Sequence, residues 1–414
     1  MRRLIYNIKE LVGILPPDVS RLEGENMNRV ETIQNGYLII NDGIIEEFGK
    51  MEELSFNPYL SATSPQIDDK IDAKGKIVLP TFCDSHTHIC YYGTREGEFI
   101  DKIQGLSYEE IAKRGGGILN SADLLNSASE ELLYEQTMRR ANEIMEKGTG
   151  AVEIKSGYAL TLEGELKMLR VIKRIKESVP IVVKSTFLGA HAVGRAFQNR
   201  ADEYVDHICK EMIPSVAKEN LADYIDVFCD KGFFTPEQTE KILIEGIKYN
   251  LIPKIHANEL EVSGGVQVGV KSGALSVDHL ERTTSAEIEA LKGSITMPTM
   301  LPGASFFLGM PYGNGKKFIE SGLGLALASD YNPGSSPSGD MRFVMALGSI
   351  KMKLTPEQAF NSCTINSAYA MGVSHLCGSI TVGKRGSVII TKPIDSLASI
   401  AYYHHTPFIE RVIF

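Results

Sequence analysis

The sequence has no tryptophan and only six cysteines in 414 residues, and none of these cysteines forms a Cys-X-X-Cys pair. So few cysteines argue against a disulfide framework and fit a reducing compartment. No apolar run approaches the length of a membrane span, and the N-terminal stretch lacks the continuous apolar core of a secretion signal. We therefore expect a cytoplasmic protein.

Basic clusters are also missing. The chain contains 43 lysines and arginines against 52 aspartates and glutamates, which gives a formal net charge of −9. An acidic chain without a basic stripe is a poor partner for nucleic acid. A single arginine in a pocket can still bind an anionic small molecule. The excess of acidic residues and the lack of a basic cluster favour a small-molecule substrate over nucleic acid or membrane as the partner.

The middle of the chain alternates strand-like apolar runs with helix-like segments. Hydrophobic residues make up 43% of the chain, which is enough for a large core. The strand-like runs cover residues 77–88, 151–158, 181–191, 224–230, 252–259, 274–281, 294–301 and 323–330. This alternation predicts an α/β fold, a (β/α)8 TIM-like barrel. An open, doubly wound sheet is the alternative, but no Gly-X-Gly-X-X-Gly follows an early strand.

Short β-rich segments flank this middle part on both sides. Residues 36–49 contain two such pieces around Asn41-Asp42-Gly43, which is a hairpin signal. Residues 378–393 and 407–414 have the same character. We predict a small β-sandwich domain built from both termini, with residues 1–77 as its N-terminal part and 376–414 as its C-terminal part. The barrel would then span residues 78–375.

The first predicted barrel strand ends in His86-Thr87-His88. Residues i and i+2 of a strand point to the same face, so both imidazoles can enter the barrel while Thr87 points away. Active-site groups of such barrels lie at the carboxyl ends of the strands. Taken alone, a His-X-His pair fits a metal site and a plain polar strand end equally well.

Other predicted strands end in residues of the same kind. His256, His279 and Asp330 come at the ends of the fifth, sixth and eighth runs. His86, His88, His256 and Asp330 would hold zinc or another first-row divalent ion and leave a position for water. That shared placement favours a metal site over a polar strand end.

Hydrolysis at such a site also needs groups that move protons. A bound metal lowers the pKa of water, a base must accept the proton, and a leaving nitrogen must receive one. Glu259 and His279 are the candidates for these catalytic roles. Taken alone, Glu259 is more typical of a carboxylate at a helix start, and His279 of a hydrogen-bonded core histidine. Only their positions at the strand ends favour catalysis.

These motifs resemble the metal-dependent amidohydrolase superfamily and, within it, the imidazolonepropionase family of histidine degradation. The similar stretches are "GTREGEF", "QGLSYEEIAKRGGGIL", "VEIKSGYAL", "STFLGAHA", "KIHANE", "VDHLE" and "SDYNPGSSPS". The resemblance implies hydrolytic ring opening of 4-imidazolone-5-propanoate to N-formimidoyl-L-glutamate. It also implies one zinc or iron ion on His86, His88, His256 and Asp330, and a homodimer.

The resemblance further implies a set of substrate-binding residues. They are Arg95, Tyr158, His191, Glu259, Asn332, Gly334 and Ser335. Arg95, just past the first barrel strand, would bind the propanoate, although its position alone favours a surface arginine. His279 would act as the base or proton shuttle near the metal-bound water. Whether His279 or Glu259 accepts the first proton stays open.

A single metal is expected for a further reason. Binuclear members of the superfamily usually carry a bridging lysine or glutamate at the end of the fourth strand, where this chain has Cys229 and Asp230. Lys155 belongs to the second strand, so we do not expect it to form a bridging carbamate. Two other functions stay open: another cyclic amidohydrolase or amidine deaminase with the same metal set, and a catalytically silent assembly protein.

Overall fold

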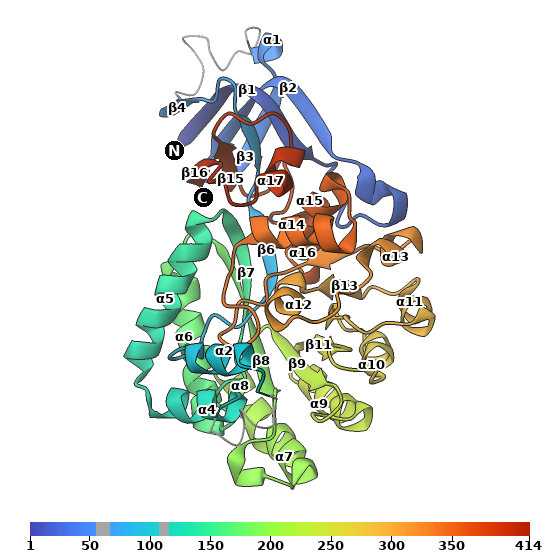
Figure 1. Ribbon diagram of the computed structural model, residues 1–414. Helices are drawn as coiled ribbons and strands as arrows, with labels where there is room; N and C mark the ends of the chain where they lie inside the picture. The colour runs from blue at the N-terminus through green and yellow to red at the C-terminus, as the bar shows by residue number, and fades with distance from the viewer. Residues whose placement is uncertain (55–66, 107–115) are drawn as a thin grey trace.

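The computed structural model describes residues 1–54, 67–106 and 116–414. Its strands form two sheets, one from the middle of the chain and one from its ends. Figure 1 shows the terminal sheet, with both chain ends, at one end of the molecule and the barrel-like part at the other. The predicted α/β architecture is therefore confirmed.

The barrel sheet has the strand order β14-β13-β12-β11-β9-β8-β7-β6, with the short β10 beside β9. All these pairings are parallel. The strands are β6 (Phe82–Thr87), β7 (Thr149–Lys155), β8 (Val182–Ala190), β9 (Tyr224–Cys229), β10 (Ile252–Pro253), β11 (Ile255–Ala257), β12 (Ser276–His279), β13 (Met297–Met300) and β14 (Ala326–Leu327). Each of the predicted strand-like runs contributes a strand to this sheet.

Helices lie between these strands, as the βα alternation requires. In the barrel part they are α2 (Glu96–Ile103), α4 (Ile118–Ser127), α5 (Glu130–Glu146), α6 (Leu162–Ser178), α7 (Ala201–His207), α8 (Ile213–Lys218), α9 (Pro236–Lys248), α10 (Gly265–Lys271), α11 (Ser285–Leu291), α12 (Pro302–Leu308), α13 (Gly315–Glu320), α14 (Met341–Met352), α15 (Pro356–Cys363) and α16 (Ile365–Ala370). Thr235, Thr284 and Thr355 begin α9, α11 and α15 with complete capping boxes.

The terminal sheet has seven strands in the order β16-β15-β5-β1-β2-β3, with β4 beside β1. They are β1 (Arg2–Ile14), β2 (Glu31–Asn41), β3 (Ile44–Lys50), β4 (Asp69–Asp72), β5 (Ile77–Pro80), β15 (Val388–Thr391) and β16 (Ile409–Ile413), accompanied by the short helices α1 (Met51–Leu54) and α17 (Ala398–Tyr402). β5 pairs with β1 on one side and β15 on the other, so the two ends of the chain share one sheet.

The hairpin prediction at the N-terminus is confirmed. β2 and β3 pair antiparallel across Asp42 and Gly43, whose φ angles are +48° and +79°. Two successive residues with positive φ are typical of the tight turns that match the twist of paired strands. Some apolar side chains of this sheet, such as Ile5, Leu38 and Val388, form a hydrophobic cluster of their own, whereas others, such as Leu79 and Ile389, belong to the main cluster of the barrel part.

The structure corrects the prediction of one continuous strand over residues 77–88. This run is divided into β5 in the terminal sheet and β6 in the barrel. Between them, the Thr81 amide donates to the Ser387 carbonyl at 3.1 Å, and the Phe82 amide donates to the Gly148 carbonyl at 2.9 Å. The chain thus changes sheets at Thr81, and residues 78–80, assigned above to the barrel, pair in the terminal sheet.

Within the described parts of the chain, no helix has both the length and the apolar character needed to cross a membrane.

Candidate active site

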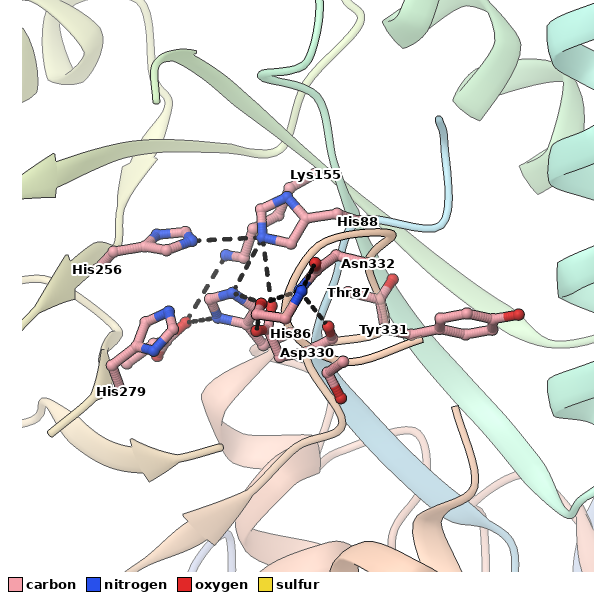
Figure 2. Close-up of polar contacts among 12 residues, drawn as sticks. His86, Thr87, His88, Lys155, His256, His279, Asp330, Tyr331 and Asn332 are labelled. Carbon is pink, nitrogen blue, oxygen red and sulfur yellow. Dashed lines mark hydrogen bonds and ion pairs between the residues drawn. The ribbon is translucent and has the colours of Figure 1, made fainter. Parts of the chain in front are cut away.

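The predicted metal ligands meet at the carboxyl ends of the barrel strands. His86 lies on β6 and His88 directly follows it, while His256 lies on β11 and Asp330 follows β14. Strand alternation sends both histidines of β6 into the barrel, and Thr87 instead donates its hydroxyl toward the neighbouring β7. In Figure 2 these side chains converge from different strands on one centre.

The same residues close the barrel between its first and last strands. The Asp330 amide donates to the His86 carbonyl at 3.0 Å, and the His88 amide donates to the Tyr331 carbonyl at 2.9 Å. Thr87 and Tyr331 form a parallel bridge between these two hydrogen bonds. Closure of the barrel therefore fixes the backbone positions of three predicted ligands, namely His86, His88 and Asp330.

The donor atoms lie at separations that suit a single metal ion. The Nε2 atoms of His86 and His88 are 3.2 Å apart, and His256 Nε2 is 3.4 Å from His88 Nε2. Asp330 Oδ1 lies 3.6 Å from both His86 Nε2 and His88 Nε2. Ligands around a tetrahedral zinc with bonds of about 2.0–2.1 Å are about 3.3–3.4 Å apart, which these distances approach.

Two buried aspartates orient the imidazoles. His86 Nδ1 donates to Asp278 Oδ2 at 2.7 Å, and His256 Nδ1 lies 2.9 Å from Asp226 Oδ2. Because a carboxylate accepts, the proton belongs on Nδ1, and the Nε2 lone pair faces the centre. Burial and Lys155 keep the pKa of His86 well below its usual range, so this ring is neutral. Converging lone pairs need a cation between them, so the donor set fits a metal ion.

His279 lies beside this cluster with two carboxylates. Its Nδ1 is 3.6 Å from Glu281 Oε2 and 3.7 Å from Glu259 Oε2. Burial lowers the pKa of His279, but Glu259 and Glu281 outweigh it and raise this pKa to about 10. Burial raises the pKa of Glu259 to about 7. Glu259 and His279 thus form a close pair of titratable groups beside the metal donors.

The backbone is strained at two of these positions. His279 has a φ of +86° and Asp330 a φ of +54°, and residues other than glycine rarely adopt such backbone angles. Such strain persists where the surrounding structure enforces it, and it clusters at functional sites. At Asp330 the barrel-closing hydrogen bond to His86 supplies that constraint.

A cavity of about 550 Å³ adjoins these groups, which is a size suited to a small molecule. It is lined by every predicted substrate-binding residue, namely Arg95, Tyr158, His191, Glu259, Asn332, Gly334 and Ser335. Lys102 and Phe228 line the same cavity, and the sequence analysis had not singled them out. Residues that lie far apart in the chain therefore share one pocket.

Tyr158 and His191 connect this cavity to the metal donors. The His191 ring stacks on His88 at a centroid distance of 5.2 Å, and Tyr158 meets His191 edge-on at 5.2 Å. His191 Nδ1 donates to the Gly157 carbonyl at 3.0 Å, which leaves Nε2 as an acceptor. A Cβ at Gly157, whose φ is +102°, would lie 2.7 Å from the Leu188 carbonyl oxygen, so this turn requires glycine.

The cationic part of the cavity is formed by Arg95 and Lys102. Arg95 donates to Glu98 Oε2 from Nε at 2.9 Å and from Nη2 at 2.5 Å. Lys102 Nζ donates to the Gly334 carbonyl at 3.0 Å, and a Cβ on Gly334 would lie 2.2 Å from Arg95 Nη1. Arg95 and Lys102 thus bring two cationic side chains to one wall of the cavity, which suits an anionic group.

The loop after Asp330 is held together by its own side chains. Asn332 Oδ1 accepts from the amides of Gly334 and Ser335, each at 2.8 Å, and its Nδ2 donates to the Asp330 carbonyl at 2.7 Å. The Ser335 hydroxyl donates to Asp330 Oδ2 at 3.1 Å. The side chains of Asn332 and Ser335 thus shape the loop and orient Asp330 as well as lining the cavity.

Sequence reasoning missed the two orienting aspartates, although a signal was present. Asp226 and Asp278 each interrupt an apolar barrel strand, and both are buried. A charged residue inside a buried strand needs a partner, so such a position indicates a functional or structural contact. Lys102 offered no comparable signal, because a lysine near the end of a helix is most often exposed to solvent.

Comparison with known proteins assigns the family. A family model described as the amidohydrolase family matches residues 77–414. The chain belongs to this family. It is 54% identical over 413 residues to the imidazolonepropionase of Flavobacterium johnsoniae, with 100% of this chain and 98% of that one covered. The imidazolonepropionase of Christiangramia forsetii is 51% identical over 412 residues, with the same coverage. The resemblance to the imidazolonepropionases is thereby confirmed.

Solved structures of similar fold confirm the architecture. A triazine hydrolase variant has a TM-score of 0.74 at 13% identity, covering 100% of this chain and 93% of that one. An adenosine deaminase from Xanthomonas campestris with bound zinc has a TM-score of 0.70 at 13% identity, covering 99% and 91%. Guanine deaminase from E. coli has a TM-score of 0.70 at 14% identity, covering 99% and 98%. At these identities the likeness concerns the fold alone.

Proposed function

We propose that this chain hydrolyses 4-imidazolone-5-propanoate to N-formimidoyl-L-glutamate in histidine degradation. The observation that carries the proposal is the single cavity in which Arg95 and Lys102 lie with Glu259 and His191, next to the histidine cluster. This arrangement suits a small ring that carries a carboxylate. The full-length imidazolonepropionase relatives support the same activity.

We propose that His86, His88, His256 and Asp330 hold one zinc or iron ion. When bound, the ion would lower the pKa of water and polarise the ring carbonyl. A single ion is supported by the end of β9, where Cys229 and Asp230 stand in place of a bridging lysine or glutamate. Lys155, on β7, does not suit a bridging carbamate either. Its Nζ lies 2.5 Å from Glu153 Oε1 and 2.8 Å from Asp226 Oδ2, and these carboxylates stabilise its charged ammonium form. Elemental analysis should therefore find about one metal per chain.

Substrate orientation would come from the rest of the cavity. Arg95 and Lys102 would bind the propanoate, because charge-assisted hydrogen bonds to a carboxylate are stronger than neutral ones. Tyr158 and His191 would contact the ring, and His191 Nε2 is available to accept a hydrogen bond. Asn332, Gly334 and Ser335 would form the wall around the product end.

Ring opening needs two proton transfers, which we assign to Glu259 and His279. One of them accepts a proton from the attacking water, and the other delivers a proton to the ring nitrogen as its bond to the carbonyl carbon breaks. Their side chains lie 3.7 Å apart, so a proton can be shared within the pair. Glu259 lines the cavity, and the His279 ring centroid lies 5.5 Å from that of the donor His86.

The direct test is to supply freshly generated 4-imidazolone-5-propanoate to the metal-loaded protein. We expect the ring absorbance to disappear and N-formimidoyl-L-glutamate to accumulate. An amidine deaminase of the same fold would instead release ammonia from a cyclic amidine and leave the imidazolone intact. A catalytically silent assembly protein would consume neither compound.

Carboxylate recognition gives a separate prediction. We expect Arg95→Ala to raise KM on the order of 10–100-fold with a much smaller change in kcat, because a lost charge-assisted hydrogen bond costs about 1.5–3 kcal/mol. We expect Lys102→Met to act in the same direction, because this change removes the second cation of the cavity. Steady-state kinetics of both variants measure the effect.

The control for this prediction is Lys176→Met, which removes a lysine of α6 that is half exposed and outside the cavity. Its KM should match that of the unchanged protein. An Arg95→Ala variant with an unaltered KM would contradict a carboxylate clamp and favour a substrate without a carboxylate.

Three more features are proposals of the same kind. We propose a division into a barrel domain of residues 78–375 and a small domain of residues 1–77 and 376–414, with β5 extending the small sheet to Pro80. We also propose a homodimer, which light scattering would detect as twice the chain mass of 45.5 kDa.

The third proposal is a cytoplasmic location, which cell fractionation would test.

A further inference from the structure

A network of buried charges lies behind the metal donors. Two lysines, Lys155 and Lys254, meet three carboxylates, those of Glu153, Asp226 and Asp278, and all five side chains are at most 1% exposed. Two of these carboxylates are the ones that orient the imidazoles of the donor set. The network therefore extends from the barrel interior to the metal site, and Figure 2 shows Lys155 beside the converging histidines.

Lys155 is the cation that contacts the orienting carboxylates most closely. Its Nζ donates to Asp226 Oδ2 at 2.8 Å and lies 3.7 Å from Asp278 Oδ2. The same Asp226 oxygen lies 2.9 Å from His256 Nδ1, and Asp226 Oδ1 accepts from the His256 amide at 3.1 Å. A continuous chain of polar contacts thus runs from Lys155 through Asp226 to His256.

Lys254 is equally buried and shares Glu153 with Lys155, but its hydrogen-bond partners differ. Its Nζ forms a close ion pair with Glu153 Oε2 and donates to the carbonyls of Ser85 and Ala370 at 3.1 and 3.2 Å. It lies 4.0 Å from Asp278 Oδ2, and among the described residues it forms no ion pair with Asp226. Lys254 therefore shares the charge environment of Lys155 without the contact that leads to His256.

Stability alone gives a poor reason for such a network. Removing charges from water costs several kcal/mol per ion, and replacing a buried ion pair by well-packed apolar groups is often neutral or stabilising. A metal-bound histidine, in contrast, depends on the group that accepts its second N–H, and losing that group typically lowers metal affinity about 10–100-fold. The contacts of Lys155 favour this second explanation.

We propose that Lys155 is a positioning residue of the metal centre, which holds the Asp226 carboxylate in the place where it orients His256. Lys155 acts through Asp226, and among the described residues it forms no hydrogen bond with a metal donor and does not line the cavity. This inference rests on the proposed metal site, but it is independent of which substrate the protein hydrolyses.

The test compares Lys155→Met with the matched control Lys254→Met, because each removes one buried cation from the same network. Zinc affinity is measured by competition with a chromophoric chelator, and the ligand field is followed by the visible absorption of cobalt(II) at the same site. We expect Lys155→Met to weaken zinc binding about 10–100-fold and to alter the cobalt spectrum. Lys254→Met should change zinc affinity by less than about threefold, because among the described residues Lys254 forms no ion pair with Asp226 and lies 4.0 Å from Asp278 Oδ2.

A double-mutant cycle separates positioning from a general effect on the fold. Asp226→Asn keeps the shape of the side chain but removes the charge that Lys155 holds. In that background Lys155→Met should weaken zinc binding far less than it does in the unchanged protein. Equal weakening in both backgrounds, or equal weakening by Lys155→Met and Lys254→Met, would overturn the proposal, as would unchanged affinity in Lys155→Met.

A charge-balanced pair of variants keeps the test decisive if the single variants do not fold. Two double variants serve, Glu153→Gln/Lys155→Met and Glu153→Gln/Lys254→Met. Each removes one negative and one positive charge from the network. Circular dichroism of the metal-free protein checks that each variant folds. The same difference in zinc affinity is expected between them, and its absence overturns the proposal. A protein that binds zinc with these differences yet leaves 4-imidazolone-5-propanoate intact would refute the proposed substrate and leave the role of Lys155 standing.

Discussion

Replacing His86 with alanine is expected to remove the bound metal and to lower ring-opening activity by at least about 10³-fold, since Lewis-acid stabilisation supplies several kcal/mol and each 1.36 kcal/mol is a factor of ten. His86 has a central place in the site. Its Nε2 lies 3.2 Å from that of His88 and 3.6 Å from Asp330 Oδ1, while its Nδ1 contacts Asp278. Its loss breaks contacts with two other ligands and leaves Asp278 without its imidazole partner.

Two measurements check this expectation on the same preparation, namely metal content by elemental analysis and turnover of the imidazolone. His375→Ala is the matched control, because His375 is exposed and lies outside the site. It should retain about one metal per chain and the full activity. Retention of metal by His86→Ala together with normal turnover would contradict the proposed ligand set.

The second large effect is expected from Glu259→Gln. This change keeps the size of the side chain but removes its ability to accept a proton. We expect kcat to fall about 10²–10⁴-fold, the range for loss of a general acid or base, while metal content stays unchanged because Glu259 is not among the donors. A rapid-quench or steady-state assay of the metal-loaded variant gives kcat directly.

Comparison with His279→Gln assigns the two proton transfers. If Glu259 accepts the proton of water, Glu259→Gln loses activity toward all substrates, whereas His279→Gln recovers part of it with an analogue whose leaving nitrogen needs no proton. The opposite pattern would reverse the assignment. A Glu259→Gln variant with unaltered kcat would exclude Glu259 from the chemistry and leave it as a wall of the cavity.

Much of the barrel and its metal donors could be predicted from local patterns. Strand alternation places His86 and His88 on one face, and the carboxyl ends of parallel strands meet at one mouth. These rules need only the order of residues along each strand. They were therefore enough to place His256 and Asp330 beside the His-X-His pair, although these residues lie far apart in the chain.

The strand boundaries near Thr81 could not be predicted in the same way. Residues 77–88 form one apolar run by composition, and both β5 and β6 are extended, so the pattern is the same on either side of Thr81. The run is divided into two strands because β5 pairs with β1 and β15, whereas β6 pairs with β7. Which strand pairs with which depends on contacts between distant segments, and a local pattern does not contain them.

By itself, the sequence determined the family, the alternation of strands and helices, and the identity of the metal-donor candidates, because each depends on residue type and on local spacing. Only the tertiary structure decided that Asp226 and Asp278 orient the imidazoles, that Lys102 joins Arg95 in the cavity, and that Lys155 lies behind His256. These contacts cross the barrel interior between strands. They are set by the register and closure of the sheet, which follow from the packing of the whole chain rather than from any one segment.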